Sequence, residues 1–142
     1  MAVSNVYLNF PGNAEEAFDF YKSVLGGEFH MVQRFGDTPH GDQLPEEEKK
    51  KIMHISLPIG AGTMIMASDA IESMGQKLTI GNNFYICLSP DSEEDADQIF
   101  NGLSAGGKVE MGMEKTFWGA YFGSFADKFG VHWMVNYEYN QH

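Results

Sequence analysis

Residues 119–137 read GAYFGSFADKFGVHWMVNY, and this stretch decides the class of fold. It contains two strand-like runs joined by a turn at residues 127–130. In the second run, apolar and mixed positions alternate: Val131, Trp133, Val135 and Tyr137 share one face, and His132, Met134 and Asn136 share the other. The alternation predicts a sheet with one face under helices and a second face that can line a cavity.

The chain contains the same succession of elements twice. Each half is predicted to form a strand, a helix and three more strands. The first half has strands at 5–10, 29–35, 51–59 and 63–68 and a helix at 13–25; the second has strands at 83–89, 108–113, 119–125 and 131–137 and a helix at 92–105. Residues 37–50 are predicted to be a loop, and residues 69–81 a connector between the halves.

A shift of 78 residues aligns the two halves. It places Tyr7 on Tyr85, and it aligns Asn13 and Asp91, each a predicted helix N-cap with a glutamate three residues later. Gly26 and Gly106 each begin a Gly-Gly pair that is predicted to end the helix. The pattern predicts an α/β (α+β) fold of two βαβββ repeats, at about 1–70 and 80–139, within a single domain of residues 1–142.

Composition excludes several classes of protein. The net charge is −11, with 20 acidic and 9 basic residues, which argues against nucleic acid or an anionic membrane as partner. No apolar run approaches the roughly 20 residues that span a bilayer, and residues 1–10 do not resemble a signal peptide. The single cysteine, Cys87, cannot form an internal disulfide and fits a reducing compartment, so we expect a cytoplasmic protein.

The strand faces opposite the apolar faces are the candidate ligand-binding surfaces. Each helix must cover the apolar face of its own sheet, so the other faces can turn toward a cleft or be buried by a second subunit. The side chains predicted on them are Asn5, Tyr7, Asn9, His54, Ser56, Met64, Met66, Tyr85, Cys87, Ser89, His132, Met134 and Asn136.

Several motifs resemble those of PhnB-like proteins in the vicinal oxygen chelate superfamily, which includes glyoxalase I, extradiol dioxygenases, and fosfomycin and bleomycin resistance proteins. The motifs cover nearly the whole chain: Tyr7–Phe10, Gly12-Asn13, Glu15–Ala17, Phe20-Tyr21, the His54 strand, Met66–Ala70, Trp118-Gly119, Asp127–Gly130 and Trp133. The resemblance implies the two-repeat fold and a homodimer. Some relatives carry a ubiquinone-methyltransferase label, but this chain has no glycine-rich nucleotide-binding loop to support it.

The resemblance also implies where a divalent metal would bind, with His, Glu or Gln ligands from four strands. The matching positions here fall within Asn5 to Tyr7, at or beside Met66, at Tyr85 and at Met134. None offers the imidazole or carboxylate that such an ion prefers. We therefore expect no metal at this site and no cofactor.

The remaining candidates each have a functional and a structural interpretation. His54 and His132 are the candidate catalytic residues. Each can bind a ligand, act in acid–base chemistry or form a displaced metal site, or it can be a structural histidine that is hydrogen-bonded in or near the core. The methionines are predicted to form a flexible, apolar lining of the cavity, and Cys87 is predicted to be a buried, unreactive thiol. Trp118 and Tyr121 can stack on a ligand or belong to the core or a dimer contact.

Two main hypotheses for function follow. The first is a metal-free protein that binds an aromatic or amphipathic small molecule through Tyr7, Asn9, His54, Met66, Tyr85, Trp118, His132 and Met134. The second is a lyase, isomerase or transferase that uses a histidine or tyrosine as its acid–base group, with or without a displaced metal. A purely structural role is a third.

Overall fold

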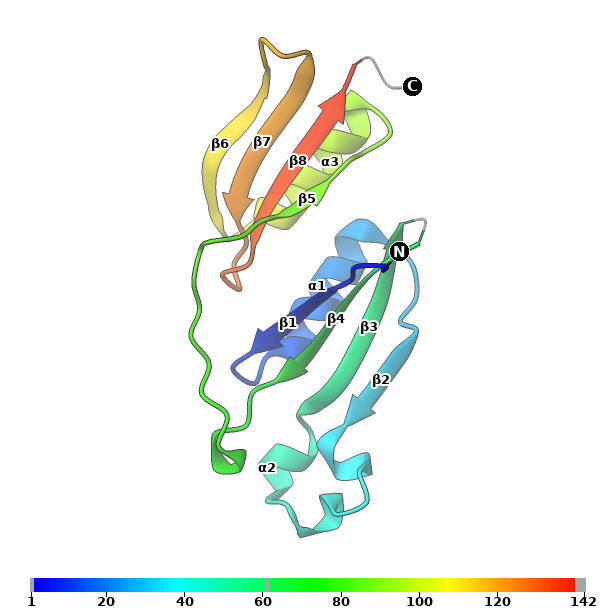
Figure 1. The fold of residues 1–142 in the computed structure, drawn as a ribbon, viewed down its shortest axis with the longest axis vertical. Helices are drawn as coiled ribbons and strands as arrows, with labels where there is room; N and C mark the ends of the chain where they lie inside the picture. The colour runs from blue at the N-terminus through cyan, green and yellow to red at the C-terminus, as the bar shows by residue number, and fades with distance from the viewer. Residues whose placement is uncertain (1, 61, 140–142) are drawn as a thin grey trace. The chain divides into compact units, whose positions relative to one another are not determined.

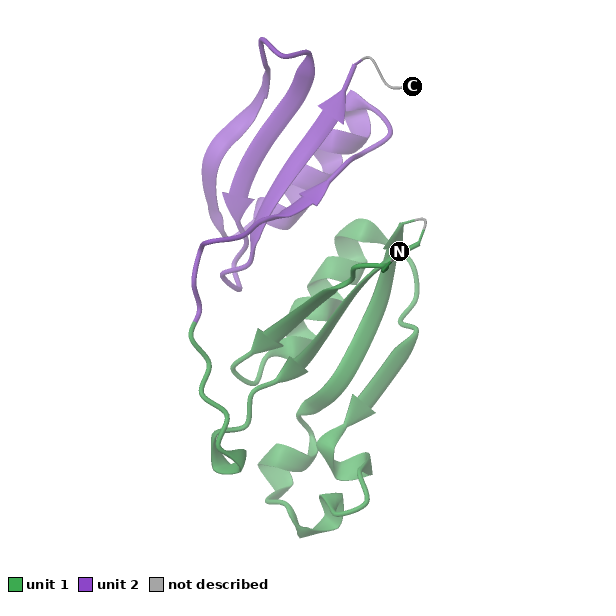
Figure 2. Ribbon diagram, in the orientation of Figure 1, with its two compact units in different colours: residues 1–79 green, residues 80–142 purple. Residues whose placement is uncertain are grey.

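The computed structural model describes residues 2–60 and 62–139. The chain divides into two compact units, Met1–Thr79 and Ile80–His142 (Figure 2). Each unit contains one four-stranded sheet. No helix in the described part of the chain is long and apolar enough to cross a membrane.

Unit 1 contains the first βαβββ repeat. Its main elements are β1 (Val6–Phe10), α1 (Ala14–Leu25), β2 (Met31–Arg34), β3 (Ile52–Gly60) and β4 (Thr63–Asp69) (Figure 1). The sheet order is β1-β4-β3-β2, with β1 parallel to β4 and the other pairs antiparallel. The predicted loop and connector hold short helical turns: η1 (Phe35–Asp37), η2 (Gly41–Gln43), α2 (Glu46–Lys49) and η3 (Glu72–Met74).

Unit 2 repeats this topology. Its elements are β5 (Ile86–Leu88), α3 (Glu93–Ser104), β6 (Lys108–Lys115), β7 (Ala120–Ala126) and β8 (His132–Glu138). The sheet order is β5-β8-β7-β6, again with the first strand parallel to the last. The predicted fold of two βαβββ repeats is confirmed.

The core of each unit lies between its sheet and its long helix. In unit 1, Phe18 and Tyr21 of α1 and Ile55 and Ile65 of the sheet are fully buried. In unit 2, Trp133 is fully buried, as its place on the apolar face of β8 predicts. Figure 1 shows α1 and α3 each on one side of the sheet of its own unit. The opposite face of each sheet, here called its open face, has no long helix of its own unit on it.

Asn13 is the N-cap residue of α1 as predicted, although its side chain does not act as expected, and the predicted cap of α3 is off by one residue. The Asn13 side chain makes no capping hydrogen bond; instead the buried carboxylate of Asp69, at the end of β4, accepts a hydrogen bond of 2.9 Å from the Ala14 N–H. The helix α3 is capped by Ser92 rather than Asp91, and Ser92 Oγ accepts from the Asp95 N–H at 3.0 Å. A local motif thus starts α3, whereas a residue 55 positions away serves α1.

The first strand of the second repeat is shorter than predicted. It covers only Ile86–Leu88, and Phe84, expected on the apolar face, is 52% exposed. Because β5 pairs with β8 at three positions only, residues 83–85 lie outside the ladder. The aromatic side chains of Phe84 and Tyr85 therefore remain accessible.

Candidate functional site

The open face of unit 1 carries polar and sulfur side chains from three adjacent strands. In the register of the sheet, Tyr7 on β1 lies beside Met66 on β4, and Met66 lies beside Ser56 on β3. The Tyr7 hydroxyl is 3.5 Å from His54 Nδ1, so the two side chains meet across β4. The Ser68 hydroxyl hydrogen-bonds Asn9 at 3.2 Å. The structure thus brings Tyr7, His54 and Met66, predicted site residues, to one face.

The open face of unit 2 holds a tighter cluster, which we call the Tyr85–Glu110–His132 cluster. The Tyr85 hydroxyl donates a 2.8 Å hydrogen bond to Glu110 Oε1. The second carboxylate oxygen, Oε2, is 3.6 Å from His132 Nδ1. The rings of Tyr85 and His132 meet edge to face, with centroids 5.3 Å apart. A carboxylate, a phenol and an imidazole therefore converge on one site.

Glu110 was not predicted as a site residue, because its place depends on an irregularity in β6. The register between β6 and β7 shifts between Val109 and Met111, as at a β-bulge, and Glu110 is the residue between them. Bulges redirect side chains. The residue of β7 opposite His132 is Ala126, whose small side chain leaves room for the carboxylate to reach β8. The sequence of β6 gives no clear signal for Glu110, because the strand carries three other charged residues, Lys108, Glu114 and Lys115.

The electrostatics of the cluster follow from its hydrogen bonds. The pKa of Tyr85 is raised, chiefly because its hydroxyl donates to the Glu110 carboxylate and loss of that proton would place two negative charges together. His132 Nδ1 is buried and has no hydrogen-bond partner, and 3.6 Å is too long for a hydrogen bond to Glu110. The cluster therefore has unmet hydrogen-bonding capacity at a buried nitrogen.

The residues next to this cluster carry sulfur atoms. Met134 follows His132 on the same face and lies beside Cys87 in the sheet. Cys87 is exposed, which corrects the prediction of a buried thiol, although atoms around its sulfur exclude enough water to raise its pKa. A raised pKa disfavours the nucleophilic thiolate. The structure therefore gives Cys87 no activation as a nucleophile.

Trp118 and Tyr121 lie in different environments. Tyr121 is on the helix side, where its hydroxyl donates a 2.7 Å hydrogen bond to Asp97 of α3, an interaction that raises the Tyr121 pKa. Trp118 lies in the turn between β6 and β7, is 57% exposed and contacts Phe122 edge to face at 6.1 Å. Phe122 pairs with Asn136 on the open face. Trp118 thus lies next to the open face, whereas Tyr121 connects the sheet to helix α3.

The residues at the positions implied for a metal do not fit one. The first position falls within Asn5 to Tyr7, the second at or beside Met66, and the others at Tyr85 and Met134. None of them supplies an imidazole or a carboxylate, and phenols and thioethers are poor ligands for the hard and borderline divalent ions. Within residues 2–60 and 62–139, no three His, Cys, Asp or Glu side chains gather closely enough to hold an ion. His132 and Glu110 form only a pair.

Comparison with known proteins places this architecture in a family. The family described as Glyoxalase/Bleomycin resistance protein/Dioxygenase superfamily matches residues 5–135, and the chain belongs to it. The resemblance seen in the sequence motifs is thereby confirmed.

Three similar proteins match this chain over nearly its whole length. Protein YjdN of Escherichia coli (strain K12) is 37% identical over 138 residues, covering 92% of this chain and 91% of that protein. The crystal structure of protein PA1353 from Pseudomonas aeruginosa is 40% identical, with 97% and 98% coverage and a TM-score of 0.84. A structure from Bacillus cereus titled a putative 3-demethylubiquinone-9 3-methyltransferase, PhnB protein, is 23% identical, with 96% and 99% coverage and a TM-score of 0.76. The last likeness shows the fold alone.

Proposed function

We propose that this protein binds a small amphipathic molecule on the open sheet faces, without a divalent metal. The observation that carries the proposal is the composition of those faces: tyrosine, histidine and methionine side chains stand where a solvated sheet would carry lysine and glutamate. Binding sites for small molecules are largely apolar and contain a few placed polar groups. The superfamily to which the chain belongs includes bleomycin resistance proteins, which supports this class of function.

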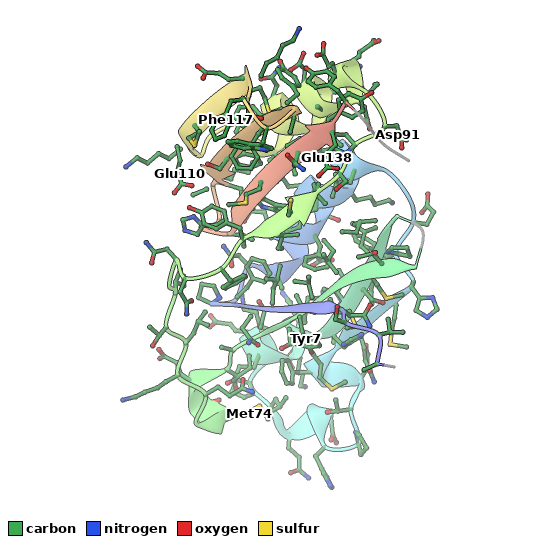
Figure 3. All side chains as sticks on the ribbon, turned by 45° about the horizontal axis from the view of Figure 1, so that its top comes forward. Tyr7, Met74, Asp91, Glu110, Phe117 and Glu138 are labelled. Carbon is green, nitrogen blue, oxygen red and sulfur yellow. The ribbon has the colours of Figure 1, made fainter. Side chains whose placement is uncertain are left out.

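A screen by NMR tests binding directly. Protein labelled with 13C at the methionine methyl groups reports separately on Met66 in unit 1 and Met134 in unit 2. Met74, exposed in η3 outside the strands of the sheet and labelled in Figure 3, serves as an internal control. A ligand should shift Met66 or Met134 and leave Met74 unchanged. Equal shifts at all three methionines would indicate nonspecific association and contradict the proposal.

The absence of a metal is a separate part of the proposal. It rests on the poor donor set within Asn5 to Tyr7, at or beside Met66, and at Tyr85 and Met134. It also rests on the lack, among the described residues, of a third ligand beside His132 and Glu110. Protein purified without a histidine tag should contain well under one equivalent of zinc, nickel, manganese or iron. A stoichiometric metal that is lost on mutating His54 or His132 would overturn this part and favour a metal-dependent enzyme.

A second candidate function is a metal-independent enzyme, and the Tyr85–Glu110–His132 cluster favours it. A carboxylate beside an imidazole can orient that ring and stabilise its protonated form during proton transfer, and a tyrosine can supply a second proton. The reaction class would be a lyase, isomerase or transferase. Loss of turnover of a substrate in His132→Asn, with binding retained, would establish it.

The edge strands and the single cysteine bear on the oligomeric state and the cellular location of the protein. The edge strands β2 and β6 carry exposed apolar residues, including Met31, Val32, Val109 and Met111. Because exposed edges of this kind pair readily, we propose a homodimer. Light scattering that gives a monomer at high micromolar concentration would contradict it. The reducing environment that suits one unpaired cysteine supports a cytoplasmic location.

A further inference from the structure

The Tyr85–Glu110–His132 cluster contains two adjacent atoms that a ligand can satisfy together. His132 Nδ1 is buried without a hydrogen-bond partner, and Glu110 Oε2 lies 3.6 Å from it. Tyr85 occupies only the other oxygen, Oε1. Buried polar atoms in native proteins nearly always have a partner, so an unpaired nitrogen beside a carboxylate calls for one.

A positively charged nitrogen suits this pair. With the imidazole neutral and protonated at Nε2, Nδ1 is an acceptor, and both oxygens of Glu110 are acceptors. An ammonium group carries three donors, enough to pair with both Nδ1 and Oε2, and its hydrogen bond with the carboxylate is charge-assisted. No lysine or arginine of the described chain lies within 4.0 Å of Glu110 to supply that charge from the protein. The net charge of −11 adds a long-range attraction for cations.

An aromatic group suits the surface beside this pair. Met134 lies two residues beyond His132 on the same face of β8, a separation of about 7 Å along a strand. Phe122 faces the same side from β7, with Trp118 against it. Methionine thioethers and aromatic rings pack well against another aromatic ring. The spacing therefore matches a ring joined to an amine by a short chain.

We propose that unit 2 binds an arylalkylamine, with its ammonium group between His132 Nδ1 and Glu110 Oε2 and its ring over Met134. This inference rests on the proposed binding function and names its ligand class. It also assigns Glu110, a residue of β6 that is labelled in Figure 3, as the residue that selects for positive charge.

The probes are three indoles with a similar side chain and different charge: tryptamine (positive), tryptophol (neutral) and indole-3-propionate (negative). Each is titrated into protein carrying 13C-labelled methionine methyl groups, and the shift of Met134 gives the dissociation constant. Tryptamine should bind about tenfold more tightly than tryptophol, since one charge-assisted contact is added. Indole-3-propionate should bind most weakly.

Matched variants identify the carboxylate. Glu110→Gln should weaken tryptamine binding about tenfold and change tryptophol binding little. Glu94→Gln on α3 makes the same change in net charge from the helix side of the sheet, and it should preserve the preference. His132→Asn should also weaken tryptamine binding, so the test does not depend on the Glu110→Gln variant alone. The NMR spectrum of each variant without ligand shows whether it is folded.

The outcomes separate the two levels of the proposal. If tryptophol binds as tightly as tryptamine, or if Glu94→Gln and Glu110→Gln act alike, the charge-selective site is wrong and the binding function stands. If none of the probes moves Met134 at millimolar concentration, the inferred site is overturned, and the binding function then depends on the response of Met66 to the wider screen.

Discussion

The open faces of the two units carry the same pair of residue types in different arrangements. In unit 1 the Tyr7 and His54 strands are separated by β4, whereas in unit 2 His132 lies on β8, directly beside the strand that follows Tyr85. A shift of 78 residues relates both pairs in the sequence, but His54 and His132 do not occupy equivalent strands. Among the described residues, a hydrogen bond to a carboxylate, Glu110, is added to the pair in unit 2 and not to the pair in unit 1. Repeated residues therefore need not form repeated sites.

The buried aspartates of the two units differ in a similar way. Asp69 in unit 1 accepts hydrogen bonds from Ala14 N at 2.9 Å and Ile52 N at 2.8 Å, so it joins the start of α1 to the start of β3. Asp127 in unit 2 accepts from Trp133 Nε1 at 2.8 Å and from the Phe129 N–H at 2.8 Å, within one turn. The Asp69 carboxylate therefore links segments that are distant in the sequence, whereas the Asp127 carboxylate stabilises a single hairpin.

The largest expected effect concerns the core of unit 2. Trp133→Ala should lower the free energy of unfolding by about 3–5 kcal/mol, because it removes a fully buried indole and leaves a cavity. Chemical denaturation measures the change. The exposed Trp118 provides the matched control, and Trp118→Ala should change stability by less than about 0.5 kcal/mol. A loss below about 1 kcal/mol for Trp133→Ala would mean that the two faces of β8 are assigned the wrong way round.

The second prediction tests the long-range anchor of unit 1. Asp69→Asn should lower the free energy of unfolding by about 2–3 kcal/mol, because an amide retains only one acceptor oxygen and leaves a buried backbone N–H unpaired. Asp19→Asn, at an exposed position of α1, is the control and should have little effect. Similar denaturation midpoints for the two variants would show that Asp69 is not the anchor.

The third prediction compares the starts of the two long helices. Ser92→Ala should cost about 1 kcal/mol, since it removes the acceptor of the Asp95 N–H. Asn13→Ala should be close to neutral, because the Asn13 side chain makes no capping hydrogen bond and Asp69 serves α1. Thermal or chemical denaturation distinguishes them. A larger loss for Asn13→Ala would reverse this assignment.

The smallest expected effect concerns the end of unit 2 at alkaline pH. Loss of hydration raises the pKa of Tyr139 to about 12, with a further contribution from its hydrogen bond to Glu93. The folded state thus retains this proton better than the unfolded state, so the stabilisation is complete below the ordinary value of 10.0 and is lost as pH rises toward about 12. Tyr139→Phe should show a shallower loss of stability across that window, measured by denaturation at successive pH values. An unchanged slope would contradict the assignment.

Periodic and local features of the fold could be predicted from the sequence. The alternation around Trp133, the turn at residues 127–130 and the two helices followed from side-chain spacing, which depends on neighbours in the chain. The open-face positions of Tyr7 and Met134 followed from the same alternation. At the start of α3, the adjacent Asp91 and Ser92 are both residue types that cap helices, and the prediction of Asp91 as the N-cap was off by one residue.

The pattern of residue types along the sequence by itself determined the two repeats and the core faces of the strands around Leu8 and Trp133, because these depend on residue type and period. Only the tertiary structure decided that Asp69 caps α1, that Glu110 turns across Ala126 toward His132, and that Tyr85 shares its carboxylate. These contacts join residues 22 to 55 positions apart through strand order and a shift in register, which no local pattern encodes.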